Sequence, residues 1–417
     1  MTDSRHRQAH DVRMQGFERR HTVHSALAWL DAQLQPLGAE PVALAAAAGR
    51  VLAAPITSGV DVPGFDRATM DGYAVIADDT EGAAPYTRVA LTVIGDALPA
   101  APFSGSVGRG QAVRIMTGAP MPTGSDAVLP AEWVEAAAGT PDRVMAVATV
   151  SPRKHVGARG EDIAAGARLL DSGRILRPQD LGVMSSVGIS QLDVVRRPIV
   201  RLAITGNELL PAGSRPGGFH ITDANGPMLT ALAERDGAVV HAPGLVRDDA
   251  DAILEALHAD ADVVIVSGGS SVGIEDLAPM LLAGHGELAV HGIAMRPSSP
   301  TGLGRLGHRL VFLLPGNPVS ALCAYDFFAG RAIRALGGRP PAWPYRAVRA
   351  TLARKISSPI GRLDYARVKL DGGVVEPLSV AGASILSSTT RADGFVVVGE
   401  DSEGLAAGAD VEVWLYA

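Results

Sequence analysis

The stretch Asp262-Val263-Val264-Ile265-Val266 is almost wholly apolar and runs directly into Ser267-Gly268-Gly269-Ser270-Ser271-Val272-Gly273. A short apolar run that ends in a glycine-rich turn is typical of a buried strand in a parallel sheet. Glycines directly after such a strand let backbone N–H groups approach a phosphate, and the following helix N-terminus favours its negative charge. The stretch therefore predicts an α/β domain with an anion-binding turn.

The segments on both sides of this strand continue the same alternation. Further strands are expected at residues 199–204, 238–242, 288–293 and 310–314. Helices are expected at residues 224–235, at 249–258 behind an Asp248 cap, and from Pro318 to 336. Alternating apolar strands and helices predict a doubly wound parallel sheet, covered on both faces, over residues 197–340.

The remaining sequence predicts a multidomain α/β protein with three smaller parts. Residues 21–61 and 153–196 read as a mixed α/β domain, whose first helix carries Val23, Leu27, Leu30 and Leu34 behind an N-cap at Thr22. Short alternating runs separated by Gly, Pro and Asp indicate a small β-rich domain over residues 62–152. Residues 345–417 predict a small C-terminal β-barrel or sandwich, of which we favour the barrel, with a hairpin turn at Asp371-Gly372-Gly373. Residues 1–20 read as a disordered tail.

Composition limits the classes of function. The 417 residues are 47% hydrophobic and 19% charged, with a net charge of -7 that is spread along the chain. That balance suits an ordered protein of several domains and gives no electrostatic footprint for nucleic acid or an anionic membrane. No apolar run is long enough for a membrane span, so we expect a cytoplasmic protein. The single cysteine, Cys323, lies in an apolar helical pattern and reads as a small buried thiol.

Carboxylates follow the predicted strands. Glu208 comes after the first strand in Thr205-Gly206-Asn207-Glu208, and Asp276 follows the serine-glycine turn. Ligands of open α/β sheets bind outside the carboxyl ends of the strands. If the sheet order brings the two loops together, Glu208 and Asp276 could hold Mg²⁺, which takes oxygen ligands and bridges phosphates. Pro315-Gly316-Asn317-Pro318 reads mainly as a helix-opening turn that shapes the pocket wall.

Three polar loops lie outside this domain. They are residues 66–74, residues 114–132 and residues 157–162, and each taken singly reads as a turn with surface charges. The histidines of the folded body show no metal-ligand spacing. There is also no nucleophile elbow and no Walker-type phosphate loop.

Taken together and in order, these motifs resemble the MoeA family of molybdopterin molybdenumtransferases, to which the E domain of gephyrin is related. The resemblance runs from about residue 21 to residue 417. The matching segments are residues 62–66, 70–74, 115–120, 159–163, 205–209, 223–225, 267–273 with Asp276, and 314–318. Their number and order carry the resemblance, because no single motif would.

The resemblance implies an elongated homodimer of four-part subunits, whose α/β part looks like the molybdopterin-binding fold of MogA-type adenylyltransferases. It places Asp66, Thr117 and Asp162 at functional positions of the family, with Glu208 and Asp276 as further catalytic residues and metal ligands. The residues that it assigns to substrate binding are Asp223, Ser267, Gly268, Gly269, Ser270, Ser271, Gly273, Arg296, Pro315 and Pro318.

The implied reaction starts from adenylylated molybdopterin and molybdate. Molybdate enters the dithiolene, the phosphoanhydride is cleaved, and AMP leaves as molybdenum cofactor forms. Mg²⁺ held by acids would neutralise the diphosphate. MogA-type adenylyltransferase and molybdoenzyme-maturation factors are the implied partners.

One loop departs from the family pattern. Relatives usually carry Lys-Pro-Gly-Lys-Pro where this chain has Arg296-Pro297-Ser298-Ser299-Pro300. Arg296 keeps a positive charge but is not interchangeable with lysine, and Ser299 removes the second cation. We expect weaker oxyanion affinity, or compensation by a nearby arginine such as Arg305.

Two other functions share many of these features. A MogA-like molybdopterin adenylyltransferase would have the same serine-glycine turn, although the additional domains and the Asp71-Gly72-Tyr73 loop favour molybdenum insertion. A non-catalytic molybdopterin-binding or scaffold paralogue is the third reading. ATP consumption would indicate the first alternative, and ligand binding without turnover the second.

Overall fold

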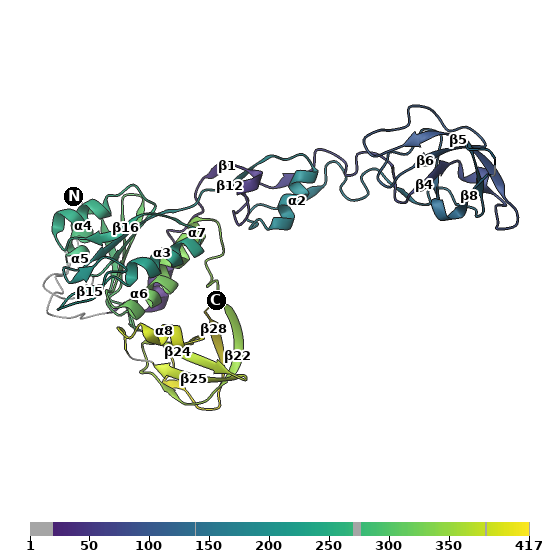
Figure 1. The fold of residues 1–417 in the computed structure, drawn as a ribbon. Coiled ribbons are helices and arrows are strands. Elements are labelled where there is room, and N and C mark those ends of the chain that lie inside the picture. The colour runs from purple at the N-terminus through teal and green to yellow at the C-terminus, as the bar shows by residue number, and fades with distance from the viewer. Residues whose placement is uncertain (1–19, 138, 270–276, 380–381, 417) are drawn as a thin grey trace, which may run out of the picture. The chain divides into compact units, whose positions relative to one another are not determined.

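The computed structural model describes residues 20–137, 139–269, 277–379 and 382–416. The chain forms two compact units, one from Pro41 to Val194 and one from the segments that end at Glu40 and begin at Val195 (Figure 1). Among the described helices, none combines the length and the apolar character needed to cross a membrane.

The larger unit is built on a six-stranded sheet of order β16-β13-β17-β21-β20-β18. Its strands are β13 (Ile199–Thr205), β16 (Val239–Val246), β17 (Val263–Ser267), β18 (Glu287–His291), β20 (Gly302–Leu306) and β21 (Arg309–Leu314). Four neighbouring strands, β16, β13, β17 and β21, are parallel, and β20 and β18 pair antiparallel at one edge. The predicted parallel sheet is confirmed for the four strands from β16 to β21, and the other two strands are antiparallel.

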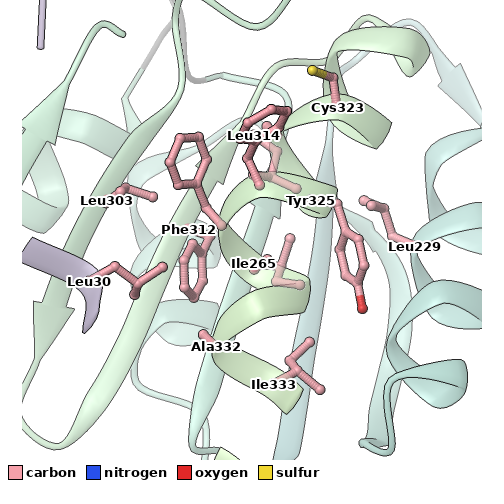
Figure 2. Packing of buried hydrophobic residues seen from close by; sticks show 14 of the residues in the cluster. Leu30, Leu229, Ile265, Leu303, Phe312, Leu314, Cys323, Tyr325, Ala332 and Ile333 are labelled. Atoms are coloured by element: carbon pink, nitrogen blue, oxygen red, sulfur yellow. The ribbon is translucent and has the colours of Figure 1, made fainter. Parts of the chain in front are cut away.

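Alternating side chains of the strands divide between two cores. The helices of this unit are α1 (Val23–Asp31), α3 (Asn225–Arg235), α4 (Ala250–Leu257), α5 (Ala278–His285), α6 (Pro318–Ala324) and α7 (Gly330–Leu336). Ile265 and Phe312 pack against α1, α3 and the α6–α7 segment, as Figure 2 shows. Val264 and Val311 face the opposite way, against α4 and α5. Helices therefore cover both faces, as predicted for a doubly wound fold.

Local details differ from the sequence predictions in three places. The side chain of Asp249, and not that of Asp248, caps α4 by accepting from the Ala252 N–H at 2.9 Å. Strand β20 was not predicted, because it carries glycines; a Cβ on Gly304 would lie 2.1 Å from the Glu287 carbonyl oxygen. The helix after Pro318 contains a π-helical turn, η4 (Tyr325–Ala329), between α6 and α7.

The C-terminal part of the same unit is a closed five-stranded barrel, as predicted. Its strands are β22 (Arg346–Leu352), β24 (Leu363–Asp371), β25 (Val374–Ser379), β26 (Gly394–Val398) and β28 (Asp410–Leu415). The order β24-β25-β22-β28-β26 closes because β26 also pairs with β24. Smaller elements are β19 (Met295–Arg296), which adds to β24, the β23 (Ile356–Ser357) and β27 (Gly404–Leu405) pair, and α8 (Ser387–Arg391). The predicted hairpin joins β24 to β25, with positive φ at Gly372 and Gly373.

The second unit combines a curled β-rich sheet with a smaller mixed region. The sheet has the order β7-β4-β6-β5-β9-β8. Its strands are β4 (Gly72–Val75), β5 (Val89–Ala97), β6 (Gln111–Ile115), β7 (Ala127–Pro130), β8 (Val134–Ala136) and β9 (Arg143–Ala146). The mixed region contains α2 (Pro178–Ser186) and the short strand pairs β1 (Ala39–Ala43) with β12 (Gln191–Val195), β2 (Ile56–Thr57) with β11 (Arg168–Leu170), and β3 (Arg67–Ala68) with β10 (Val156–Gly157).

Candidate functional site

A cavity of about 530 Å³ lies at the carboxyl ends of the parallel strands. The end of β13 contributes Thr205, and the end of β17 contributes Ser267 with the following glycines. Residues 315–318, which follow β21, form another wall. This is the edge where an open α/β sheet binds its ligands, so the cavity is the candidate site.

Three carboxylates line the cavity. They belong to Glu208, Asp223 and Asp248. The other described lining residues carry no basic side chain: they are Ile204, Thr205, Leu209, Ile221, Thr222, Ala224, Asn225, Ser267, Gly268, Gly269, Pro300, Pro315, Gly316, Asn317, Pro318 and Ser384. Within the described lining, an anionic ligand therefore has no protein cation to neutralise it.

The loops that carry Glu208 and Asp223 are held together by backbone pairing. Strand β14 (Leu209–Leu210) begins directly after Glu208, and strand β15 (Ile221–Thr222) ends directly before Asp223. The two strands pair in parallel. The Asp223 N–H donates to the Leu210 carbonyl at 2.9 Å, and the Asp223 Oδ1 accepts from the Gly226 N–H at 2.8 Å. A Cβ on Gly226 would lie 2.2 Å from the Asp223 Oδ2, so glycine at this position keeps the carboxylate in place.

Asn225 ties the loops of the cavity to one another. Its Nδ2 donates to the Ser267 Oγ at 2.9 Å and to the Gly316 carbonyl at 2.8 Å. Its Oδ1 and the Thr205 Oγ1 are buried oxygen atoms with no hydrogen-bond partner among the residues that the structure describes. Because a buried polar atom without a partner costs free energy, these two oxygens are ready contacts for a bound ligand.

The serine-glycine turn packs tightly on β13. A Cβ on Gly268 would lie 2.2 Å from the Thr205 carbonyl oxygen, and the φ of Gly268 is +102°. The Gly268 N–H donates to the Leu314 carbonyl at 3.1 Å, so this amide is already used within the fold. Of the two described glycines of this turn, Gly269 is therefore the one whose backbone N–H is the candidate donor to a bound phosphate.

Several predicted site residues lie outside the described residues. They are Ser270, Ser271, Gly273 and Asp276. The predicted pairing of Glu208 with Asp276 as metal ligands therefore stays a prediction. Within the described ranges, no group of three or more His, Cys, Asp or Glu side chains could hold a metal ion.

Arg296 does not line the cavity. Its guanidinium pairs with the Asp364 carboxylate at the start of β24, and Arg362 donates to the same carboxylate at 2.9 Å. Of the loop from Arg296 to Pro300, only Pro300 is a lining residue. The Ser299 Oγ is buried and has no hydrogen-bond partner within the described part of the chain.

Asp66, Thr117 and Asp162 belong to the second unit. The Arg153 Nη1 donates to the Asp66 Oδ2 at 2.5 Å, and the Arg159 N–H donates to its Oδ1 at 2.8 Å. These two hydrogen bonds, the first above all, lower the pKa of Asp66 below its usual range.

Thr117 is fixed by an acid of its own unit. Its N–H and its Oγ1 both donate to the Asp71 Oδ1, at 2.7 and 2.8 Å, which lowers the pKa of Asp71. Asp162 is exposed, and its N–H donates to the Val62 carbonyl at 3.1 Å.

Four polar groups of the cavity were not predicted from the sequence. Asp248 was read as a helix cap, yet its position just beyond β16 places it at the carboxyl edge of the sheet, which is the signal that could have identified it. The free oxygen atoms of Thr205 and Asn225 follow only from packing. Ser384 reaches the cavity because the neighbouring Ala383 carbonyl accepts from the Val319 N–H at 3.0 Å, a contact that no sequence pattern predicts.

Comparisons with known proteins cover almost the whole chain. Residues 21–188 match the family description "MoeA N-terminal region (domain I and II)", residues 202–335 match "Probable molybdopterin binding domain", and residues 349–416 match "MoeA C-terminal region (domain IV)".

Individual relatives match over most of their length. Molybdopterin molybdenumtransferase 2 of Mycobacterium tuberculosis is 36% identical over 388 residues, which cover 89% of this chain and 94% of that protein. Molybdopterin molybdenumtransferase of Staphylococcus aureus (strain MSSA476) is 30% identical over 403 residues, which cover 94% of this chain and 95% of that protein. The crystal structure of a molybdopterin biosynthesis MoeA protein from Pyrococcus horikosii superposes with a TM-score of 0.82 at 34% identity, covering 95% of this chain and 99% of that one.

Proposed function

The chain belongs to the MoeA family, and from this premise we propose that it inserts molybdenum from molybdate into adenylylated molybdopterin, releasing AMP and molybdenum cofactor. Relatives named molybdopterin molybdenumtransferase support the coarser statement that it is a transferase of molybdenum cofactor biosynthesis. The adenylylated substrate, the use of Mg²⁺ and the release of AMP are the parts that we add.

The acidic character of the cavity carries the proposal. Adenylylated molybdopterin contains a diphosphate, whose negative charge would be repelled by Glu208, Asp223 and Asp248. Since no described lining residue is basic, a bound diphosphate needs a cation from solution. A divalent metal ion that binds together with the substrate meets this need.

Mg²⁺ suits the donor set. It is usually bound by one or two carboxylates together with substrate phosphates and water, and rarely by an all-protein cage. Glu208 and Asp223 would supply the carboxylates from the described lining, and the predicted ligand Asp276 lies outside the described residues. The ion would neutralise the diphosphate and make AMP a better leaving group.

The chain's own residues would orient the substrate. The Thr205 Oγ1 can donate to a phosphate oxygen, and its burial strengthens that hydrogen bond. Asn225 fixes the distance between Ser267 and Gly316, so the two walls of the cavity keep their spacing during the reaction. The dithiolene sulfurs belong to the substrate, so the buried Cys323 has no part in the chemistry. The homodimer and the cytoplasmic location stay predictions.

The decisive experiment is incubation with adenylylated molybdopterin, Mg²⁺ and molybdate while nucleotides are followed. We expect AMP release that depends on both molybdate and Mg²⁺. Consumption of ATP with molybdopterin would instead indicate an adenylyltransferase. Substrate binding without any AMP release would indicate a non-catalytic paralogue.

A further inference from the structure

A second cavity, of about 600 Å³, adjoins the candidate site. It lies along the outer face of α3, between the turn after β14 and the end of β16. Its lining residues are Pro211, Ala212, Asp223, Gly226, Pro227, Thr230, Ala231, Glu234, Gly244 and Leu245. Asp223 lines both cavities, so a ligand that reaches past this residue could occupy the two at once. We call this second cavity the α3 groove.

Small side chains from one face of α3 form one wall of the α3 groove. Pro227, Thr230, Ala231 and Glu234 follow one another at the i, i+3, i+4 and i+7 spacing of a single helix face. Most of the lining side chains are small, and Leu245, 37% exposed, is the one large apolar side chain among them. Gly226 and Glu234 are separated by about 12 Å along the helix axis, a length suited to several fused rings.

The polar groups of the α3 groove accept hydrogen bonds. Asp223 and Glu234 contribute carboxylates, Thr230 contributes a hydroxyl, and none of the described lining residues is basic. The Glu234 carboxylate has neither an ion pair nor a hydrogen bond within the part of the chain that the structure describes. An occupant should therefore not be anionic and should present N–H donors in the plane of its ring system.

We propose that the α3 groove binds the pterin ring of the substrate, with the donor edge of its pyrimidine ring on Glu234. This rests on the proposed function. The 2-amino-4-oxo edge of a pterin offers two adjacent N–H donors, which match the two oxygens of one carboxylate. Adenine sets its amino group beside ring nitrogens that only accept, and a carboxylate repels these. The acceptor-rich lining thus selects the pterin end of the substrate, and Asp223 marks the junction with the phosphate end.

Binding of two small probes to the full chain tests this assignment. The probes are 6-hydroxymethylpterin, followed by its own fluorescence, and AMP, followed by calorimetry in the presence of Mg²⁺. Glu234→Gln removes the charged acceptor, and Ala231→Trp fills the groove from an exposed helix position. The matched control is Glu255→Gln, because Glu255 is an exposed residue on α4 that lines neither of the two cavities.

We expect both groove variants to weaken pterin binding by about tenfold or more while AMP affinity and the control stay at wild-type values. Unchanged pterin affinity in both variants would overturn the proposal, as would a wild-type chain that does not bind the pterin probe. Loss of AMP affinity instead would assign the groove to adenine. Neither probe undergoes turnover, so the binding test does not depend on catalysis. A failure of molybdate-dependent AMP release would refute the proposed function, and the binding data would still test the groove assignment.

Discussion

Replacing Gly226 by alanine should displace the Asp223 carboxylate. The added Cβ would lie 2.2 Å from the Asp223 Oδ2, whereas ordinary contacts begin at 3.4 Å, so the two atoms must separate by about 1.2 Å (3.4 minus 2.2). The same shift stretches the hydrogen bond from the Gly226 N–H to the Asp223 Oδ1, now 2.8 Å. A misplacement of about 1 Å in a substrate-positioning group can cost roughly a hundredfold in rate.

The expected effect on folding is much smaller. Alanine improves helix propensity by about 1 kcal/mol, and weakening a hydrogen bond to a charged acceptor costs about 1.5–3 kcal/mol. The variant should therefore lose about 1 kcal/mol of unfolding free energy and remain folded. Its kcat/KM for molybdate-dependent AMP release should fall about a hundredfold.

Gly182→Ala is the matched control. Gly182 lies in the middle of α2, and a Cβ there would meet nothing within 4 Å. This variant should keep wild-type activity and gain about 0.5–1 kcal/mol of stability. A Gly226→Ala protein that folds and retains wild-type kcat/KM would refute the assignment of Asp223 to the site.

The remaining predictions concern the metal, the oxyanion, a helix cap and a buried acid. Glu208→Gln should raise the Mg²⁺ concentration for half-maximal AMP release by about tenfold or more; unaltered Mg²⁺ dependence would count against Glu208 as a ligand. Ser299→Lys should lower the half-saturating molybdate concentration. An unchanged value would contradict the hypothesis that serine in place of lysine at this position weakens oxyanion binding. Asp249→Ala should lower the free energy of unfolding by about 1 kcal/mol in urea melts through loss of the α4 cap, and an unchanged midpoint would remove Asp249 from that role. Burial raises the pKa of Asp326 from 3.8 to about 6, so the native state binds the extra proton between these values. The contribution of Asp326 to the free energy of unfolding is present below pH 3.8 and is lost as pH rises through about 6. Asp326→Asn should remove about 3 kcal/mol of the change in unfolding free energy between about pH 3.5 and 7, measured by urea unfolding at each pH. A variant with the same pH profile as the wild type would contradict the raised pKa of Asp326.

The architecture of the larger unit could be predicted because its strands are continuous apolar runs. Residues buried on both faces of a sheet leave an unambiguous pattern, and the strands that contain Ile265 and Phe312 are of this kind. Strand β20 could not be predicted, since Gly302 and Gly304 are present for close backbone approach and carry no apolar pattern. For the same reason Gly72, which begins β4, read as part of a turn: a Cβ there would lie 2.1 Å from the Leu129 carbonyl oxygen.

The candidate site could be predicted only where it follows strand ends. Ser267 ends β17, Pro315 follows β21 and Glu208 lies in the loop after β13, so strand order brings them to one cavity. Arg296 was expected at the substrate from the family resemblance, whereas the structure pairs it with Asp364, a partner 68 residues away. Long-range ion pairs of this kind leave no local signal in the sequence.

Anomalous diffraction from crystals of the full chain grown with Mn²⁺ and AMP tests the central claim most directly, because Mn²⁺ can replace Mg²⁺ at oxygen sites. The account predicts a manganese peak in the cavity, bound to the Glu208 or Asp223 carboxylate and to the AMP phosphate. A peak elsewhere in the chain, or AMP bound in the cavity with no metal beside its phosphate, would contradict it.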